Sequence, residues 1–231
     1  MIRKYDILLS DLDNTLLDFT AAEHNAIGKL LLHYGAVADD EAKNAYSKFN
    51  DSLWKRLERR EITRDELIYM RFREFFRLRG IDGDGGEAAA LYEKYLSEGG
   101  IWMEHGQELF ERCKGKVKIY IISNGTATVQ LPRLRLTGID KMADGHFISE
   151  LVGCNKPDKR YFDKVFAEIP GFDRERALLL GDSMTADISG GIACGLDTCL
   201  FDKDGKYNEG GRIKPMYVIN ELPEIFDILN I

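Results

Sequence analysis

The stretch YDILLSDLDNTLLD, residues 5–18, places a run of apolar residues directly before two aspartates, Asp11 and Asp13. The apolar run is typical of a buried strand, and residues two apart in a strand project to the same face. We therefore expect Asp11 and Asp13 to project together from the end of the first strand. Because like charges repel, the pair favours a divalent cation between them or one carboxyl group with a raised pKa. For this segment alone, an Asp-rich turn after a strand is an equally good explanation.

Four further short apolar runs lie between segments of helical periodicity. They are VKIYIIS, ALLLG, DTCLF and MYVIN, and none of them alternates with polar residues. Continuous apolar runs are typical of strands that are covered on both faces, as in parallel sheets. The alternation of such runs with helices predicts an α/β fold, with a doubly wound and mostly parallel sheet.

Residues 19–97 lie between the first and second strand candidates and contain only helical patterns. We expect this segment to form an all-helical cap domain of four helices. The catalytic core would then be built from residues 1–18 and 98–231, with the cap inserted between its first two strands.

Local signals mark the starts and ends of these helices. Thr20 with Glu23, and Thr63 with Glu66, have the spacing of a capping box, in which each side chain of the pair satisfies a backbone N–H of the other residue. The pairs predict helix starts at both places. Gly80 predicts the end of the helix that begins after Thr63, because glycine readily adopts the left-handed conformation that ends many helices.

The composition excludes several functional classes. The chain has 231 residues, of which 44% are hydrophobic and 31% charged, and no apolar run approaches the length of a membrane span. Its net charge of −7 disfavours a broad basic face for a nucleic-acid polymer. The four cysteines form no CxxC pair, which disfavours a disulfide framework or a structural zinc site. We expect a cytoplasmic protein without a membrane or nucleic-acid partner, as a monomer or weak homodimer.

Three later segments place polar groups at the ends of predicted strands or the starts of helices. IYIISNG ends in Ser123 and Asn124, NKPDKRYF contains Lys156, and LLLGDSMTADISGG contains Asp182 and Asp187. Ligands of open α/β sheets bind at the carboxyl ends of the strands. Each segment alone also has an ordinary explanation: a turn, a surface lysine or a helix-capping aspartate.

In this order, the four segments together resemble the haloacid dehalogenase-like hydrolase superfamily. Its signature is D-x-D-x-T after the first strand, then a Ser or Thr, a lysine, and G-D-x-x-x-x-D. This sequence supplies DLDNT, SNG, NKP and GDSMTAD. The resemblance covers the whole predicted sheet domain, and the helical insertion has the position and type of that superfamily's helical cap.

The resemblance implies the chemistry of a phosphoryl-transfer enzyme. Asp11 would be the nucleophile, attacking phosphorus to give an aspartyl-phosphate. Asp13 would protonate the leaving oxygen and then deprotonate the hydrolytic water. Mg²⁺ would be bound by the Asp11 carboxylate, the Asp13 backbone carbonyl and Asp182.

The remaining motif residues would hold the phosphate and the catalytic groups. By the same resemblance, Ser123 and the backbone N–H of Asn124 would bind phosphoryl oxygens, with Lys156 as a catalytic and phosphate-binding charge. Asp187 would orient a metal-bound water or Lys156 from outside the metal's coordination shell.

By the same resemblance, dehalogenases of the superfamily lack an acidic residue at the position of Asp13, so this residue favours phosphoryl transfer over dehalogenation. The segment FNDSLWKRLERREITRDELIYMRF, residues 49–72, resembles the cap of 5′-nucleotidases that remove phosphate from pyrimidine nucleotides, including non-standard ones. Asn50, Trp54 and Arg71 are therefore candidates for substrate contact. A solvated helix face would explain Asn50 and Arg71 as well, and a place in the cap core would explain Trp54.

These patterns predict a Mg²⁺-dependent phosphomonoesterase for a small phosphorylated metabolite, with a pyrimidine nucleoside 5′-monophosphate as the leading substrate. A sugar phosphatase or a phosphomutase of the same superfamily is the alternative within enzymes. The alternative from another class is a non-catalytic module that senses phosphate or binds a partner protein.

Overall fold

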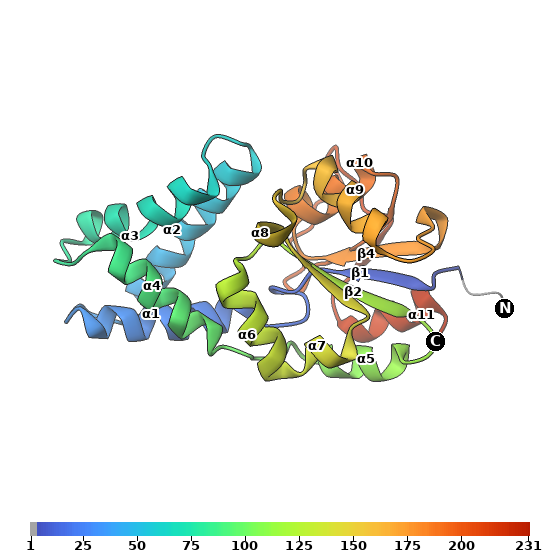
Figure 1. Cartoon of the computed structure of the whole chain (residues 1–231), viewed down its shortest axis with the longest axis horizontal. Coiled ribbons are helices and arrows are strands. Elements are labelled where there is room, and N and C mark those ends of the chain that lie inside the picture. The colour runs from blue at the N-terminus through green and yellow to red at the C-terminus, as the bar shows by residue number, and fades with distance from the viewer. Residues whose placement is uncertain (1–3) are drawn as a thin grey trace. The chain divides into compact units, whose positions relative to one another are not determined.

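The chain forms two compact units in the computed structural model, which describes residues 4–231 (Figure 1). The sheet unit comprises residues 4–18, 102–127 and 137–231. The helical unit comprises residues 19–101 and 128–136. Each unit has its own core.

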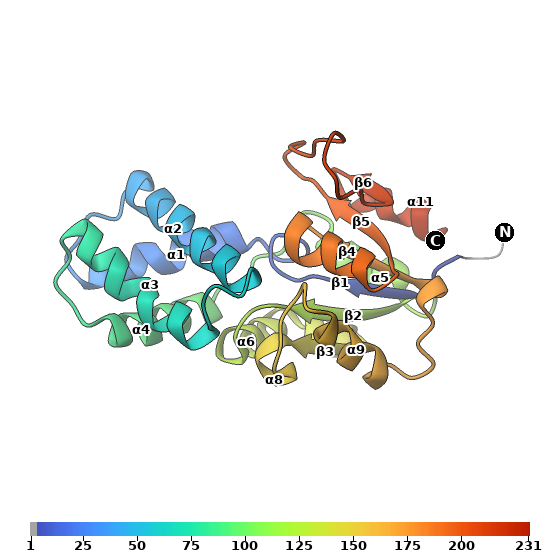
Figure 2. The ribbon, with the colours of Figure 1, turned by 90° about the horizontal axis from the view of Figure 1, so that it is seen from above.

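The sheet unit is built on six parallel strands in the order β3-β2-β1-β4-β5-β6, which Figure 2 shows from above. Their bounds are β1 Ile7–Ser10, β2 Lys118–Ser123, β3 Gly145–Ile148, β4 Ala177–Gly181, β5 Asp197–Phe201 and β6 Tyr217–Ile219. β1, β2 and β4 are apolar and largely buried, as expected of central strands with helices on both faces. The predicted α/β class with a doubly wound parallel sheet is confirmed.

Helices cover both faces of this sheet. α9 and α10 lie on one face, and α5, α7 and α11 lie on the other (Figure 1). The helices of the sheet unit are α5 Gly106–Cys113, α7 Ile139–Met142, α8 Ser149–Val152, α9 Lys159–Glu168, α10 Ser189–Ala193 and α11 Ile225–Leu229, with short turns η1 Arg174–Arg176, η2 Met184–Ile188 and η3 Leu222–Glu224.

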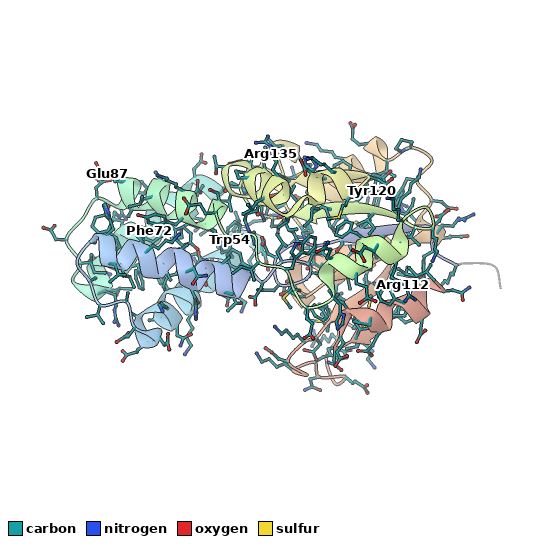
Figure 3. The ribbon with its side chains drawn as sticks, turned by 90° about the horizontal axis from the view of Figure 1, so that it is seen from below. Trp54, Phe72, Glu87, Arg112, Tyr120 and Arg135 are labelled. Atoms are coloured by element: carbon teal, nitrogen blue, oxygen red, sulfur yellow. The ribbon has the colours of Figure 1, made fainter. Side chains whose placement is uncertain are left out.

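The helical unit consists of α1 Phe19–His33, α2 Asp40–Glu58, α3 Arg64–Arg79, α4 Gly85–Ser97 and most of α6 Ala127–Thr137. Its core is rich in aromatic side chains. The ring of Phe72, a residue labelled in Figure 3, lies 5.4 Å from that of Tyr46 and 5.1 Å from that of Tyr92, centroid to centroid. Such ring pairs add stabilisation beyond the burial of apolar surface.

No helix within residues 4–231 combines the length and the apolarity needed to cross a bilayer.

One of the two predicted capping boxes is present. The Thr63 side chain accepts a hydrogen bond from the backbone N–H of Glu66, whose carboxylate accepts one from the backbone N–H of Thr63. α3 then ends at Gly80, which has a left-handed φ of 64°. The prediction of a capping box at Thr20 and Glu23 is wrong. α1 begins at Phe19, and the Glu23 carboxylate accepts hydrogen bonds from side chains of α2.

Two further features differ from the sequence-based expectation. The strand candidates did not include β3, a four-residue edge strand that is only partly buried. The predicted boundary lay after residue 97, whereas the compact units divide between Ile101 and Trp102 and residues 128–136 group with the helical unit. The assignment of the units as catalytic core and cap stays a prediction.

We expect Phe72→Ala to lower the free energy of unfolding of the helical unit by about 3–5 kcal/mol, because the substitution leaves a cavity among packed rings. Chemical denaturation followed by far-UV circular dichroism measures this loss. The matched control is Leu78→Ala on the same helix, which removes a side chain that is 60% exposed. An equal effect of the two substitutions would contradict the packing described here.

Candidate active site

The polar groups predicted from the sequence come together at the carboxyl ends of three neighbouring strands. β1 lies between β2 and β4, and these strands end at Ser10, Ser123 and Gly181. Asp11 follows β1 directly, and its backbone N–H donates to the carbonyl of Leu180 at 2.8 Å. The parallel register thus places groups that are far apart in sequence at one edge of the sheet.

Lys156 occupies the centre of this edge and is 1% exposed. Its ammonium group donates three hydrogen bonds: to Asp11 Oδ1 at 2.6 Å, to Asp187 Oδ1 at 2.7 Å, and to the Ile122 carbonyl at 2.9 Å. All three ammonium hydrogens are therefore used. The lysine ties the end of β1 to β2 and to the segment after β4.

Asn124 holds the backbone of Lys156 in place. Its side-chain amide donates to the Lys156 carbonyl at 2.9 Å, and its side-chain oxygen accepts from the Lys156 N–H at 2.8 Å. The sequence motif predicted a role only for the backbone N–H of Asn124, so the positioning role of its side chain was not predicted. The signal was available in principle, because an asparagine side chain can pair with both backbone groups of an extended residue.

The turn after β1 fixes the orientation of the two aspartates. Asn14 has a left-handed φ of 56°, a conformation that asparagine tolerates better than most residues. Its N–H donates to the Leu17 carbonyl at 2.7 Å, and Thr15 Oγ1 lies 3.3 Å from Asp11 Oδ2. Asp11 is buried and Asp13 is half-buried.

Burial and neighbouring charges shift the acid–base equilibria of these groups. Removal from water raises the pKa of Asp11 to about 7; Lys156 opposes this shift, while Asp187 and Asp13 add to it. Burial and the charges of Asp11 and Asp187 likewise raise the pKa of Asp182 well above its usual value. Burial alone would lower the pKa of Lys156, but the two carboxylates outweigh it and raise the pKa, so the lysine remains charged.

Asp187 is fully engaged by protein donors. Oδ1 accepts from Lys156, and Oδ2 accepts from the backbone N–H of Ser183 at 3.1 Å. Gly181 makes room for this side chain, since a Cβ at position 181 would lie 2.4 Å from Asp187 Cγ. The need for glycine at this position was not anticipated from the sequence.

The donor set fits a hard divalent cation. Carboxylate oxygens of Asp11, Asp182 and Asp187 all lie within 4.8 Å of one another. The charge of Asp13 also acts on Asp11, and Mg²⁺ prefers oxygen ligands of this kind. Both oxygens of Asp11 and both oxygens of Asp187 already accept hydrogen bonds from the protein, but each carboxylate oxygen has a second lone pair that can still bind a cation.

Ser123, the predicted phosphate ligand at the end of β2, is 1% exposed. Its Oγ accepts from the Gly125 N–H at 3.1 Å, which fixes the hydroxyl at the start of the loop. The structure thus brings together six of the predicted core residues: Asp11, Ser123, Asn124, Lys156, Asp182 and Asp187.

The three candidate substrate residues all lie in the helical unit. Asn50 and Arg71 are only 3% and 4% exposed, which excludes the solvated helix face that was their other explanation. Trp54 is half-buried against the cluster of Leu53, Leu57, Ile62 and Leu67, and the guanidinium of Arg64 lies 5.9 Å from its ring. Their contact with a substrate stays a prediction.

The model of the family described as haloacid dehalogenase-like hydrolase matches residues 5–195. This chain belongs to that family, which confirms the family predicted from the four motifs.

Several relatives are similar over essentially the whole chain. The HAD-hydrolase YfnB of Bacillus subtilis is 37% identical, and its crystal structure bound to magnesium, which reveals interdomain movement in that protein, has a TM-score of 0.92 over 99% of this chain and all of that one. The pyrimidine 5′-nucleotidase PynA of Streptococcus pneumoniae is 36% identical over 98% of this chain and 95% of its own. The pyrimidine 5′-nucleotidase YjjG of Escherichia coli is 30% identical over 98% of both chains.

We expect Gly181→Ala to lower the free energy of unfolding by about 1–3 kcal/mol, because the added Cβ must displace the buried Asp187 side chain. Chemical denaturation measures the change. Gly211→Ala is the control, since a Cβ there would meet only ordinary contacts, the nearest at 3.4 Å. A Gly181 variant as stable as the Gly211 variant would show that Asp187 can be moved without loss.

Mg²⁺ affinity should fall at least about tenfold in Asp182→Asn, because the substitution removes a full negative charge from the proposed cation site. Isothermal titration calorimetry with MgCl₂ measures this affinity. Asp204→Asn, which changes a surface aspartate paired with Lys206, should bind Mg²⁺ as the unmodified protein does. Equal affinities for the two variants would exclude Asp182 as a ligand.

Proposed function

We propose that this protein is a Mg²⁺-dependent phosphomonoesterase that hydrolyses a pyrimidine nucleoside 5′-monophosphate through an aspartyl-phosphate on Asp11. The observation that carries the proposal is the buried Asp11 carboxylate, whose Oδ1 lies 2.6 Å from the ammonium of Lys156 at the carboxyl ends of the strands. A carboxylate held in this way can attack phosphorus while the lysine keeps its proton throughout the reaction.

Two displacements complete the reaction. In the first, a carboxylate oxygen of Asp11 bonds to phosphorus, the bond from phosphorus to the nucleoside oxygen breaks, and Asp13 gives that oxygen a proton. In the second, water attacks phosphorus, Asp13 accepts its proton, and the bond to Asp11 breaks to release inorganic phosphate. Asp13 is only half-buried, in keeping with an exchange of protons with water.

The surrounding groups have electrostatic and positioning roles. Ser123, the backbone N–H of Asn124 and Lys156 are proposed to bind the phosphoryl oxygens. The Asn124 side chain holds the backbone of Lys156 through two hydrogen bonds, and Asp187 accepts a hydrogen bond from its ammonium group. A bound Mg²⁺, held by Asp11, Asp182 and the Asp13 carbonyl, would supply charge that lets an anionic nucleophile approach an anionic substrate.

The substrate class is proposed from similarity rather than from the catalytic groups. The catalytic groups act on the phosphate, which all phosphomonoesters share, so they do not discriminate among leaving groups. PynA and YjjG, both named pyrimidine 5′-nucleotidases, align with this chain over 98% of its length, including the helical unit. We propose that the sheet unit is the catalytic core and that the helical unit is the cap that supplies specificity.

The nucleophile assignment predicts that Asp11→Asn loses more than about 1,000-fold in kcat on an aryl phosphate, because an amide cannot form the phosphoenzyme. Steady-state assays with Mg²⁺ measure this loss, and circular dichroism checks the fold. Asp204→Asn should retain full activity. Retention of activity by Asp11→Asn would end the proposal.

A further inference from the structure

The helical unit contains three buried polar side chains in addition to its aromatic core. Glu23 on α1, Asn50 on α2 and Arg71 on α3 are each between 3% and 4% exposed. We refer to these three residues as the buried polar cluster. These three residues and their contacts lie within the helical unit.

Glu23 and Asn50 form the ordered half of the cluster. The Glu23 carboxylate accepts hydrogen bonds from the Ser47 hydroxyl and, at 2.8 Å, from the Asn50 side-chain Nδ2. Because Nδ2 must face the carboxylate, the orientation of the Asn50 amide is fixed. Its oxygen, Oδ1, is buried and has no hydrogen-bond partner in the described chain.

Arg71 forms the other half. Its guanidinium lies 5.2 Å from the ring of Phe72 and 4.9 Å from that of Tyr92, so the two rings pack against the charged group. Nη2 is 3.9 Å from Glu93 Oε1, too far for a hydrogen bond. Within residues 4–231, no acceptor is hydrogen-bonded to the buried Nε or Nη2 atoms, which are parallel donors on one edge of the guanidinium.

These buried groups without hydrogen-bond partners destabilise the folded protein. A buried donor or acceptor without a partner loses its bonds to water and gains nothing in return, and the loss is larger for a charged group. The Glu93 carboxylate lies beside Arg71 but is too far away to accept a hydrogen bond from it. The two halves are close, because the charge of Arg71 acts on the Glu23 carboxyl group and opposes the rise in pKa that burial causes there. The cluster leaves one acceptor and two donors open, and the buried hydroxyls of Tyr46 and Tyr92 in the same core also lack a partner among the described residues.

We propose that the buried polar cluster binds the pyrimidine ring of the substrate. The open groups call for a ligand edge with two acceptors and one donor. Cytosine has this set on one edge, with O2 and N3 as adjacent acceptors and the N4 amino group as the donor. In uracil the two carbonyl oxygens flank N3–H, so they do not form an adjacent pair of acceptors. The nearby carboxylates of Glu23 and Glu93 disfavour an anionic ligand, so the cluster fits a neutral ring rather than a phosphate.

This inference rests on the proposed function, since it assigns the residues that read the nucleoside part of the proposed substrate. It adds two elements to the sequence-based candidates. Glu23 becomes a positioning residue that orients Asn50, and Arg71 becomes a direct contact to the ring. Trp54, which packs on a different cluster, has no part in it.

The test compares three substrates that share the phosphate and differ in the base: uridine 5′-monophosphate, cytidine 5′-monophosphate and ribose 5-phosphate. Arg71→Met keeps most of the side-chain volume and removes the donors. We expect Arg71→Met to lower kcat/KM at least about tenfold for whichever nucleotide the unmodified protein hydrolyses more efficiently. We expect kcat/KM for ribose 5-phosphate to change less than about twofold. Asn50→Leu should act in the same direction.

The matched control is Arg73→Met, which removes a surface guanidinium two residues along the same helix, paired with Glu74. This substitution should leave kcat/KM unchanged for all three substrates. Circular dichroism and thermal unfolding of each variant check the fold. Hydrogen exchange of the unmodified protein, which needs no variant, should show that cytidine slows exchange in peptides from α2 and α3.

The possible results separate the two proposals. Hydrolysis of aryl phosphates without hydrolysis of either nucleotide would end both the proposed substrate class and this inference. Nucleotide hydrolysis that Arg71→Met leaves unchanged would end this inference alone. An equal loss on ribose 5-phosphate would show that the cluster stabilises the helical unit and does not read the base.

Discussion

The interaction on which the site depends is the buried hydrogen bonding of one ammonium group. Lys156 is almost wholly removed from water, a change that costs free energy unless opposite charges and acceptors replace the lost hydration. Asp11, Asp187 and the Ile122 carbonyl provide that replacement, one for each ammonium hydrogen. Because these acceptors come from three separate segments, the arrangement forms only when the central strands pair in the observed register.

This constraint explains how a protein with a net charge of −7 can be built to receive a phosphate. The charge of the whole chain matters less than the groups within a few ångströms of the ligand, where oriented N–H groups, a lysine and a cation dominate. Burial raises the pKa of Asp11 to about 7, and the charges of Asp187 and Asp13 add to this shift while Lys156 opposes it. The acidic cluster is therefore unfavourable by itself, and a bound divalent cation would reduce the repulsion among its carboxylates.

The sequence predicts most of the sheet and its site for a physical reason. In a parallel sheet, polar residues that follow apolar runs must gather at one edge, so the order of the motifs along the chain is enough to group Asp11, Ser123 and Asp182. β3 was not found because GHFI is short and partly exposed and lacks a continuous apolar run. The side-chain role of Asn124 and the need for Gly181 depend on contacts with residues 156 and 187, which no local pattern encodes.

The failed capping box at Glu23 has a different cause. The spacing Thr20 to Glu23 obeys a local rule, but α1 begins at Phe19, so Thr20 lies inside the helix, and the buried Glu23 carboxylate accepts hydrogen bonds from Ser47 and Asn50 on α2. Local rules fail where tertiary contacts claim a side chain, and such places are often functional. The two buried charged sites differ in this respect: all donors of Lys156 are satisfied by the fold, whereas Arg71 keeps two donors open. If the incomplete site binds the base as we propose, the ligand supplies the hydrogen-bond partners that the fold leaves out.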